Sequence, residues 1–119
     1  MAAVSKGAAG EVLAARYLRD NGYELLAANY RCRFGEIDII AADEAYIIFV
    51  EVKTRRSDAR YAPREAVTAD KQARIMKTAM LYLQRYPTDR QQRFDVVEVT
   101  TEPTQPLHAL HIQHLKNAF

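Results

Sequence analysis

Two consecutive apolar segments that carry isolated charges constrain this chain more than any other feature. Residues 36–42 and 46–54 are rich in Ile, Val and Phe, and a short turn around Asp43 and Glu44 separates them. Such runs of β-branched and aromatic residues predict two strands joined as a hairpin. Because both runs are almost continuously apolar, the strands are expected to be covered on both faces and to lie at the centre of a sheet.

The charges inside these strands are Asp38, Glu51 and Lys53. A lone carboxylate in a sheet interior is costly unless it is paired or holds a cation. Side chains alternate along a strand, so Glu51 and Lys53 point to the same face. A four-residue turn would pair Asp38 with either Phe49 or Glu51, and both registers place the two carboxylates about 5–8 Å apart between Cβ atoms.

Two interpretations of these charges stay open. In the first, Asp38 and Glu51 hold one hard divalent cation while Lys53 polarises or orients a water molecule. In the second, Glu51 and Lys53 form an ordinary ion pair on one face, and Asp38 is a half-exposed strand residue.

The rest of the chain predicts helices and strands around this hairpin. The expected elements are a helix over residues 5–21, a strand over 23–30, the two strands above, a loop over 55–63, a helix over 69–86 with Thr68 as its N-cap, a strand over 93–100, and a strand or short helix over 108–119. The order αβββαβ predicts the α/β class, with a central mixed β-sheet flanked by helices.

Length and composition indicate one small domain over residues 1–119. The single cysteine, Cys32, excludes an intramolecular disulfide and a thiolate-rich zinc site. The longest apolar run, residues 45–50, is far shorter than the ~20 residues that cross a bilayer. No signal peptide is evident, so a cytoplasmic protein is expected.

His108, His111 and His114 recur without a neighbouring acid, which argues against a metal site there.

The charge is unevenly distributed. The net charge is +2, yet residues 53–93 contain eleven of the 17 basic residues and only four of the 15 acidic ones. A basic segment that is separated from the acidic residues is typical of a protein that binds phosphate groups. A long solvated helix gives the same pattern, so both interpretations stay open.

Five motifs together resemble a known family. They are G-E-x-x-A at residues 10–14, N-Y-R-C-R-x-G-E-I-D at 29–38, F-V-E-V-K-T-R at 49–55, E-A-V with a following lysine at 65–71, and R-F-D-V-V at 93–97. Asp38 followed by Glu51-Val52-Lys53 resembles the D…E-x-K motif of the PD-(D/E)xK nuclease superfamily. The whole set looks like the YraN-like group of small bacterial proteins, itself similar to archaeal Holliday-junction resolvases, and implies a restriction-endonuclease-like core.

The resemblance also implies roles for individual residues. It implies metal ligation by Asp38, Glu51 and the backbone carbonyl of Val52, with Mg²⁺ as the ion and Mn²⁺ as a substitute. It implies that Lys53 orients the attacking water or stabilises the charge on phosphorus. Glu11 matches an additional acid of resolvase-like members. A Glu in the first turns of a helix is also common for another reason, because it interacts favourably with the helix dipole. The implied nucleic-acid contacts are Arg31, Arg33, Arg55, Arg56, Arg60, Lys71, Gln72 and Arg74.

These residues predict a Mg²⁺-dependent DNA endonuclease, with branched or junction DNA as one candidate substrate. A homodimer is expected, because one protomer carries one site and cutting two strands needs two. DNA is the expected partner, with neither a membrane nor a small-molecule cofactor. The alternative is a nucleic-acid-binding or scaffolding module of DNA recombination or repair that keeps the nuclease fold without cutting.

Overall fold

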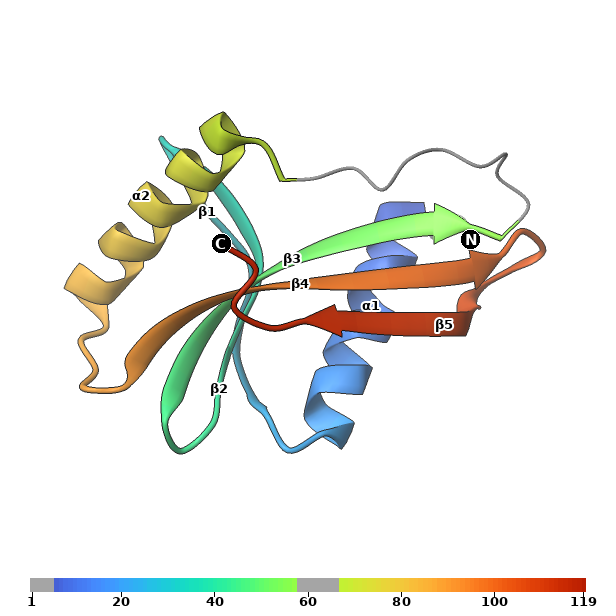
Figure 1. Ribbon diagram of the computed structural model, residues 1–119, viewed down its shortest axis with the longest axis horizontal. Helices are drawn as coiled ribbons and strands as arrows, with labels where there is room; N and C mark the ends of the chain where they lie inside the picture. Colours follow the sequence, from blue (N-terminus) through green and yellow to red (C-terminus); the bar gives the residue numbers. More distant parts are fainter. Residues whose placement is uncertain (1–5, 58–66) are drawn as a thin grey trace.

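The structure, a computed structural model, describes residues 6–57 and 67–119 (Figure 1). In chain order the elements are α1 (Lys6–Asp20), β1 (Glu24–Cys32), β2 (Gly35–Ala42), β3 (Tyr46–Arg56), α2 (Ala69–Arg85), β4 (Gln91–Glu102) and β5 (Gln105–Leu115). The predicted α/β class is confirmed. The Thr68 side chain accepts the backbone N–H of Lys71 at 3.2 Å, which confirms Thr68 as the N-cap of α2.

The strands form one mixed sheet in the order β1-β2-β3-β4-β5. β1, β2 and β3 pair antiparallel, β3 and β4 pair parallel, and β4 and β5 pair antiparallel. Parallel neighbours need a crossover connection, and the segment that contains α2 supplies it. β3 therefore lies at the centre of the sheet, as its apolar sequence predicted.

The two helices cover opposite faces of β3. Ile48 and Val50 belong to the core cluster that includes residues of α1, whereas Ile47 and Phe49 belong to the cluster that includes residues of α2. Figure 1 shows α1 behind β3, β4 and β5. Because alternate side chains of β3 enter two different cores, the first half of the strand, residues 46–50, has to be apolar at every position.

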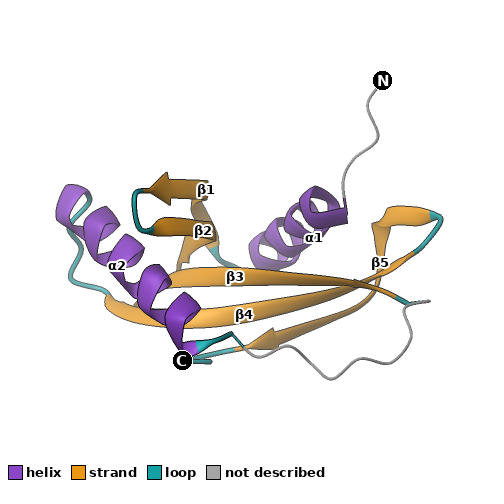
Figure 2. Cartoon of the chain, turned by 90° about the horizontal axis from the view of Figure 1, so that it is seen from above, coloured by secondary structure: helices purple, strands orange, loops and turns teal. Residues whose placement is uncertain are grey.

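β2 and β3 pair over only part of their lengths. Their ladder ends at Ile39 opposite Val50. Beyond that pair, β2 extends back to Gly35 beside β1, while β3 extends to Arg56 beside β4. The two strands therefore diverge, and we call the opening between them the β2–β3 fork. In Figure 2 the paired strands β1 and β2 lie between α2 and α1.

The structure moves several predicted boundaries by a few residues, and one of these changes turns part of a predicted loop into a strand. Arg55 and Arg56 belong to β3 and pair with Thr100 and Thr101 of β4, rather than to a loop over residues 55–63. The parallel ladder with β4 satisfies their backbone groups, and this outweighs the polar local sequence. The last predicted segment forms a strand, β5. Neither of the described helices is long and apolar enough to cross a membrane.

A buried carboxylate joins β4 to β5 and α1. Asp95 is fully buried, and the Arg93 side chain donates to both of its oxygens at 2.9–3.3 Å. His114 Nε2 lies 2.7 Å from Asp95 Oδ2, and His114 Nδ1 lies 3.1 Å from the Tyr17 hydroxyl of α1. Burial acts to raise the pKa of Asp95, but the hydrogen bonds from His114 and Arg93 outweigh it and lower the pKa. The ionised carboxylate thus links three elements.

We expect Asp95→Asn to lower the free energy of unfolding by about 3–5 kcal/mol, because the Arg93 guanidinium, which is only 11% exposed, loses its counter-charge. In the wild type, the contribution of Asp95 should be lost as the pH falls below the ordinary aspartate pKa of about 3.9, since the unfolded chain then binds the proton more tightly. Urea denaturation measures both effects. Asp89→Asn, at an exposed position, is the control; equal losses in the two variants would contradict the prediction.

Candidate functional site

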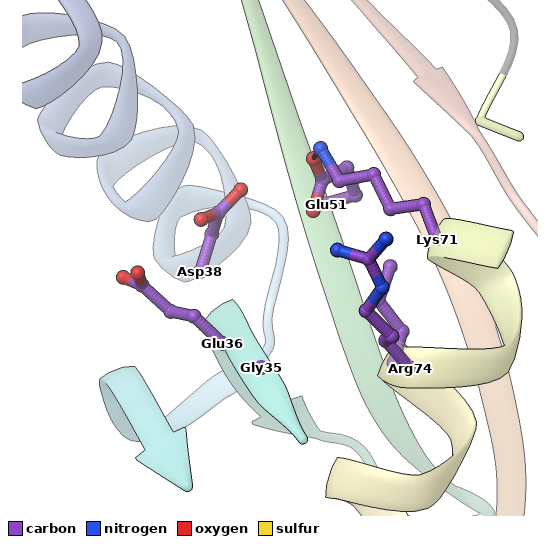
Figure 3. A pocket seen from close by; sticks show the side chains of 7 residues that line it. Gly35, Glu36, Asp38, Glu51, Lys71 and Arg74 are labelled. Carbon is purple, nitrogen blue, oxygen red and sulfur yellow. Dashed lines mark ion pairs between the residues drawn. The ribbon is translucent and has the colours of Figure 1, made fainter. Parts of the chain in front are cut away.

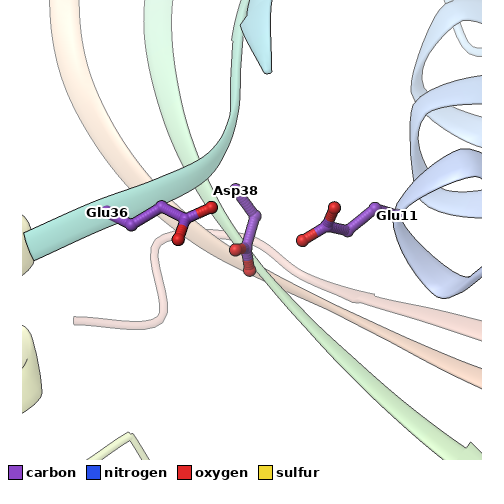
Figure 4. Close-up of side chains that lie close together, drawn as sticks. All are labelled: Glu11, Glu36 and Asp38. Carbon is purple, nitrogen blue, oxygen red and sulfur yellow. The ribbon is translucent and has the colours of Figure 1, made fainter. Parts of the chain in front are cut away.

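Three carboxylates converge at the β2–β3 fork. Glu36 and Asp38 come from β2, and Glu11 reaches toward them from α1 (Figure 4). All three are half-buried, and one carboxylate oxygen of each lies within 4.8 Å of those of the other two. We call these residues the acid cluster. Glu36 and Asp38 lie two positions apart on β2, and their carboxylates lie on the same side of the fork.

The sequence prediction included Glu11 and Asp38 but missed Glu36. The period of a strand was the signal that could have found it, since G-E-I-D places Glu36 and Asp38 on one face. Asn29 of β1 completes the arrangement. With its amide nitrogen turned toward the cluster, Asn29 donates to Glu36 Oε1 at 2.7 Å and to Glu11 Oε2 at 3.2 Å. Asn29 therefore holds two acids of the cluster side by side.

Asp38 closes the narrow end of the fork. Its Oδ2 accepts the backbone N–H of Val52 at 2.8 Å, just beyond the last pair of the ladder, Ile39 opposite Val50. This is the predicted register that places Asp38 opposite Glu51, rather than the register that pairs it with Phe49. Because a strand residue directs its N–H and its C=O to the same edge, the Val52 carbonyl also faces the fork.

The acid cluster carries an excess of negative charge. The pKa of Asp38 is raised to about 7. Burial is the largest cause, and the negative charges of Glu51, Glu11 and Glu36 add to it. The hydrogen bond from the Val52 N–H opposes the rise. A nearby cation would favour the ionised form of Asp38, so the electrostatics of the cluster suit a bound positive ion.

Glu51 faces the acid cluster across the opening and is held by two lysines. Its Oε1 lies 2.5 Å from Lys71 Nζ of α2 and 3.6 Å from Lys53 Nζ of β3. Figure 3 shows Lys71 reaching Glu51, with Asp38 and Glu36 on the opposite side. Burial acts to lower the pKa of Lys71, but its hydrogen bond and attraction to Glu51 outweigh burial and raise it. The predicted ion pair of Glu51 and Lys53 is thus present, with Lys71 added from α2.

Two adjoining cavities open at these residues. A cavity of about 250 Å³, which we call the α2 lobe, is lined by Gly35, Glu36, Asp38, Glu51, Lys71, Arg74 and Ile75. A cavity of about 400 Å³, the α1 lobe, is lined by Glu11, Asp38, Glu51, Val52, Lys53, Thr54 and Lys71. Because Asp38, Glu51 and Lys71 line both cavities, the two lobes form one trough with the carboxylates at its middle.

Gly10 lets α1 carry Glu11 into this trough. A Cβ at position 10 would lie 1.8 Å from Thr54 Oγ1 and 2.9 Å from Thr54 Cβ. No side chain fits that space unless α1 or β3 moves. The absence of a side chain at Gly10 is therefore what sets the distance between α1 and the end of β3.

Three of the predicted nucleic-acid contacts lie at the trough. Lys71 and Arg74 line the α2 lobe, and the Arg74 side chain is exposed. Arg31 Nε lies 3.3 Å from Glu36 Oε2, so it neutralises part of the acid cluster. The α2 lobe thus combines carboxylates on β2 and β3 with cations on α2. Such a site can hold a metal ion beside an anionic ligand.

The other predicted contacts are placed differently. Arg33 occupies the turn between β1 and β2, and Arg55 and Arg56 end β3. The Gln72 side chain donates to the backbone just before α2, at 2.9 Å from the carbonyl oxygen of Val67. Arg60 lies outside the described residues. The contact roles of all these residues stay predictions.

The ligands that the fork offers suit a hard divalent cation. Glu11, Glu36 and Asp38 contribute carboxylate oxygens, the donors that Mg²⁺ and Mn²⁺ prefer. Soft thiolate ligands, which favour zinc, take no part in this described cluster. The fold thus builds an acidic cluster that could hold a metal ion, in a trough that is open to solvent on the α2 and α1 sides.

Fold and site together define a small α/β protein with an acidic candidate metal site where two sheet strands diverge. The chain belongs to the uncharacterised protein family UPF0102, whose family model matches residues 10–99. This confirms the YraN-like family that the motifs indicated, while the link to the PD-(D/E)xK superfamily stays a prediction. The matched residues include the whole acid cluster as well as Glu51, Lys53 and Lys71.

Relatives with the same family name are similar over most of their length. The chain is 55% identical over 98 residues to a UPF0102 protein of Syntrophus aciditrophicus, a match that covers 82% of this chain and 77% of that protein. A UPF0102 protein of Nocardia farcinica is 53% identical with the same coverage. One of Lachnoclostridium phytofermentans is 48% identical over 82% of this chain and 84% of that protein.

We expect Gly10→Ala to weaken Mn²⁺ binding and to lower the free energy of unfolding by about 1–3 kcal/mol, because α1 must move away from β3 and takes Glu11 with it. The loss should occur although alanine favours a helix by about 1 kcal/mol over glycine. Calorimetric titration and urea denaturation measure the two effects. Thr54→Ala removes the nearest atom and should partly restore both properties in the double variant; a stabilised Gly10→Ala protein would disprove the close-approach argument.

The metal-free protein should lose stability as the pH rises from about 4 to about 7, because Asp38 binds its proton more tightly in the folded state than in the unfolded chain. Above that range Mn²⁺ should restore the stability. Thermal unfolding across this pH range, with chelator or with Mn²⁺, measures it. Asp38→Asn should flatten the pH dependence and remove the effect of Mn²⁺, whereas Glu44→Gln, at an exposed position, should behave as wild type. If the stability of Asp38→Asn depended on pH as that of the wild type does, the titrating group would be a residue other than Asp38.

Proposed function

We propose that this chain is a divalent-metal-dependent nuclease of the PD-(D/E)xK superfamily that hydrolyses phosphodiester bonds in DNA. The observation that carries the proposal is the arrangement of the trough: the acid cluster on one side, and on the other Glu51 between Lys53 and Lys71. Carboxylates beside lysines supply what phosphodiester hydrolysis requires, a place for a cation and positive donors for the phosphate.

The residues that would hold the ion lie around the fork. Asp38, Glu51 and the carbonyl of Val52 are the ligands that the motif implies, and Glu11 and Glu36 lie close enough to take part. Mg²⁺ is the proposed ion, with Mn²⁺ as a substitute. When bound, such an ion neutralises the phosphate and lowers the pKa of a coordinated water. The clustered acids also repel hydroxide and phosphate in the absence of a cation, which makes activity depend on the metal.

Lys53 and Lys71 can contact the phosphate from the side of the trough that faces the acid cluster. Lys53 lies 3.6 Å from Glu51 and can orient the attacking water or stabilise the charge that develops on phosphorus. Lys71 is half-buried in the first turn of α2 and lines both lobes. When Glu51 ligates a cation, Lys71 no longer has to neutralise it and can contact a phosphate oxygen instead.

DNA would enter along the basic side of the trough. Arg74 follows Lys71 on α2, and the segment over residues 53–93 carries most of the basic residues of the chain. Backbone phosphates are the partners that such a segment binds. We include a homodimer in the proposal, because two strand cuts need two troughs, and a cytoplasmic location, where the protein meets DNA.

Cleavage of labelled four-way-junction, flap, single-stranded and duplex DNA with Mg²⁺ or Mn²⁺ tests the proposal. We expect Asp38→Ala and Glu51→Ala each to slow cleavage by about 100-fold or more while DNA binding persists. Glu44→Ala is the matched control, an exposed carboxylate in the turn between β2 and β3 that should leave cleavage unchanged.

Two outcomes would overturn the proposal. Cleavage that survives in Asp38→Ala and Glu51→Ala would place the chemistry outside the trough. DNA binding without cutting under either metal would favour the second candidate, a non-cleaving nucleic-acid-binding or scaffolding module. The basic segment that includes α2 supports that candidate, because it needs only phosphate contacts.

A further inference from the structure

An aromatic side chain stands at the tip of the β1–β2 hairpin. The last pair of that hairpin is Cys32 opposite Gly35, so Arg33 and Phe34 form the two-residue turn. Turns of this length favour small polar residues and glycine, not phenylalanine. Phe34 is half-buried, and two cations lie near its ring, the Arg33 guanidinium at 4.7 Å and the Lys77 ammonium at 5.7 Å from the ring centroid.

The environment of Phe34 differs from that of the other phenylalanines. The chain has four, and three of them stack on one another, Phe49 on Phe94 at 5.4 Å and Phe94 on Phe119 at 5.3 Å. That stack belongs to the core cluster on the α2 side of the sheet. Phe34 instead contacts cations at a hairpin tip. Its ring is therefore an aromatic surface flanked by positive charge, the combination on which nucleic-acid bases stack.

The hairpin tip is fixed to α2. The Cys32 sulfur accepts the backbone N–H of Phe34 at 3.3 Å, and its thiol donates to Thr78 Oγ1 of α2 at 3.5 Å. Gly35 has a φ of +152°, and the Cβ direction at this residue faces α2, where a Cβ would be in ordinary van der Waals contact with Arg74 Cβ at 3.6 Å. These contacts hold the hairpin tip that carries Phe34 in place before a ligand binds. Binding then loses less free energy to the ordering of the tip.

Phe34 also lies beside the trough. Gly35, the next residue in the chain, and Arg74 both line the α2 lobe. Lys71, Arg74 and Lys77 recur every three residues on α2, and the first contacts Glu51 while the last contacts the Phe34 ring. Helix geometry gives a rise of about 9 Å from Lys71 to Lys77. A row of cations thus leads from the middle of the trough to the aromatic tip.

We infer that Phe34 is a stacking platform for an unpaired base of a DNA strand whose phosphate occupies the trough, and that Arg33, Arg74 and Lys77 hold the neighbouring phosphates. This inference rests on the proposed function, because it concerns how that site receives its substrate. A base within a duplex is covered on both faces by its neighbours and has to be unstacked first. The platform therefore selects DNA that has an unpaired nucleotide beside the scissile phosphate.

A single tryptophan tests the stacking directly. The chain contains none, so Phe34→Trp makes a protein whose tryptophan emission reports on this position alone. Tyr86→Trp is the matched control: Tyr86, like Phe34, is an aromatic residue beside an arginine, with Arg85 at 5.6 Å from its ring, but it is exposed and follows the far end of α2. Each variant is titrated with a single-stranded oligonucleotide and with its blunt duplex, and gel analysis confirms that the DNA stays intact.

Stacking predicts a saturable loss of tryptophan emission in Phe34→Trp with the single strand, none with the duplex, and none in Tyr86→Trp with either DNA. Fluorescence anisotropy of labelled DNA supplies the second measurement. Phe34→Leu keeps an apolar side chain but removes the π face, and it should weaken single-strand binding about 5- to 100-fold while duplex binding stays within about two-fold.

The outcomes separate this inference from the proposed function. Unchanged single-strand affinity in Phe34→Leu, or unchanged emission in Phe34→Trp when anisotropy shows bound DNA, overturns the platform even if the protein cuts DNA. Binding that depends on Phe34 without any cutting supports the platform and overturns the nuclease. Equal losses of single-strand and duplex binding in Phe34→Leu would assign Phe34 a purely structural role and also overturn the platform.

Discussion

The site depends on the point where the β2–β3 ladder ends. Up to Ile39 opposite Val50 the two strands satisfy each other's backbone, and beyond it each is held by its outer neighbour, β2 by β1 and β3 by β4. The first backbone donor left without a strand partner there is the Val52 N–H, and the Asp38 carboxylate accepts it at 2.8 Å. One hydrogen bond thus ends the ladder, stabilises the fork and fixes the position of the residue around which the acid cluster assembles.

Two aspartates, Asp95 fully buried and Asp38 half-buried, show how neighbouring groups decide what a carboxylate does. Asp95 accepts hydrogen bonds from Arg93 and lies 2.7 Å from His114, and these contacts lower its pKa although it is fully buried. Asp38 has other carboxylates around it, and its pKa is raised to about 7. The first residue ties β4 and β5 to α1 and stabilises the fold. Asp38 lies among carboxylates that repel one another, and this repulsion costs folding free energy. Such a cost is typical of functional sites.

Each helix does more than contribute a charged side chain to the site. Each also makes packing or hydrogen-bonding contacts that set the positions of the neighbouring elements. Gly10 lets α1 approach Thr54, and this approach carries Glu11 to the fork. α2 contributes Lys71 to Glu51, and the contact of Thr78 with Cys32 holds the hairpin tip. The trough is therefore bounded by three separately anchored elements, α1, α2 and the β1–β2 hairpin. Because each is anchored to the sheet, the carboxylates and the cations keep their places on opposite walls.

The sequence by itself determined the central hairpin, the N-cap of α2, the family, and Asp38, Glu51 and Lys53 as the charged residues of the two central strands. These follow from local rules: the period of a strand places Glu51 and Lys53 on one face, and a hairpin turn allows two registers. The hairpin adopts the register that directs Asp38 toward Glu51, and its ladder ends one pair earlier, at Ile39 opposite Val50. The tertiary structure decided what depends on long-range packing. It brought Glu36, Asn29 and Glu11 together, gave Lys71 to Glu51, extended β3 through Arg56 and paired His114 with Asp95. The contacts of Glu11, Lys71 and His114 do not follow from local spacing, because their partners are far apart in the chain and meet only when α1, α2 and the strands pack on one another.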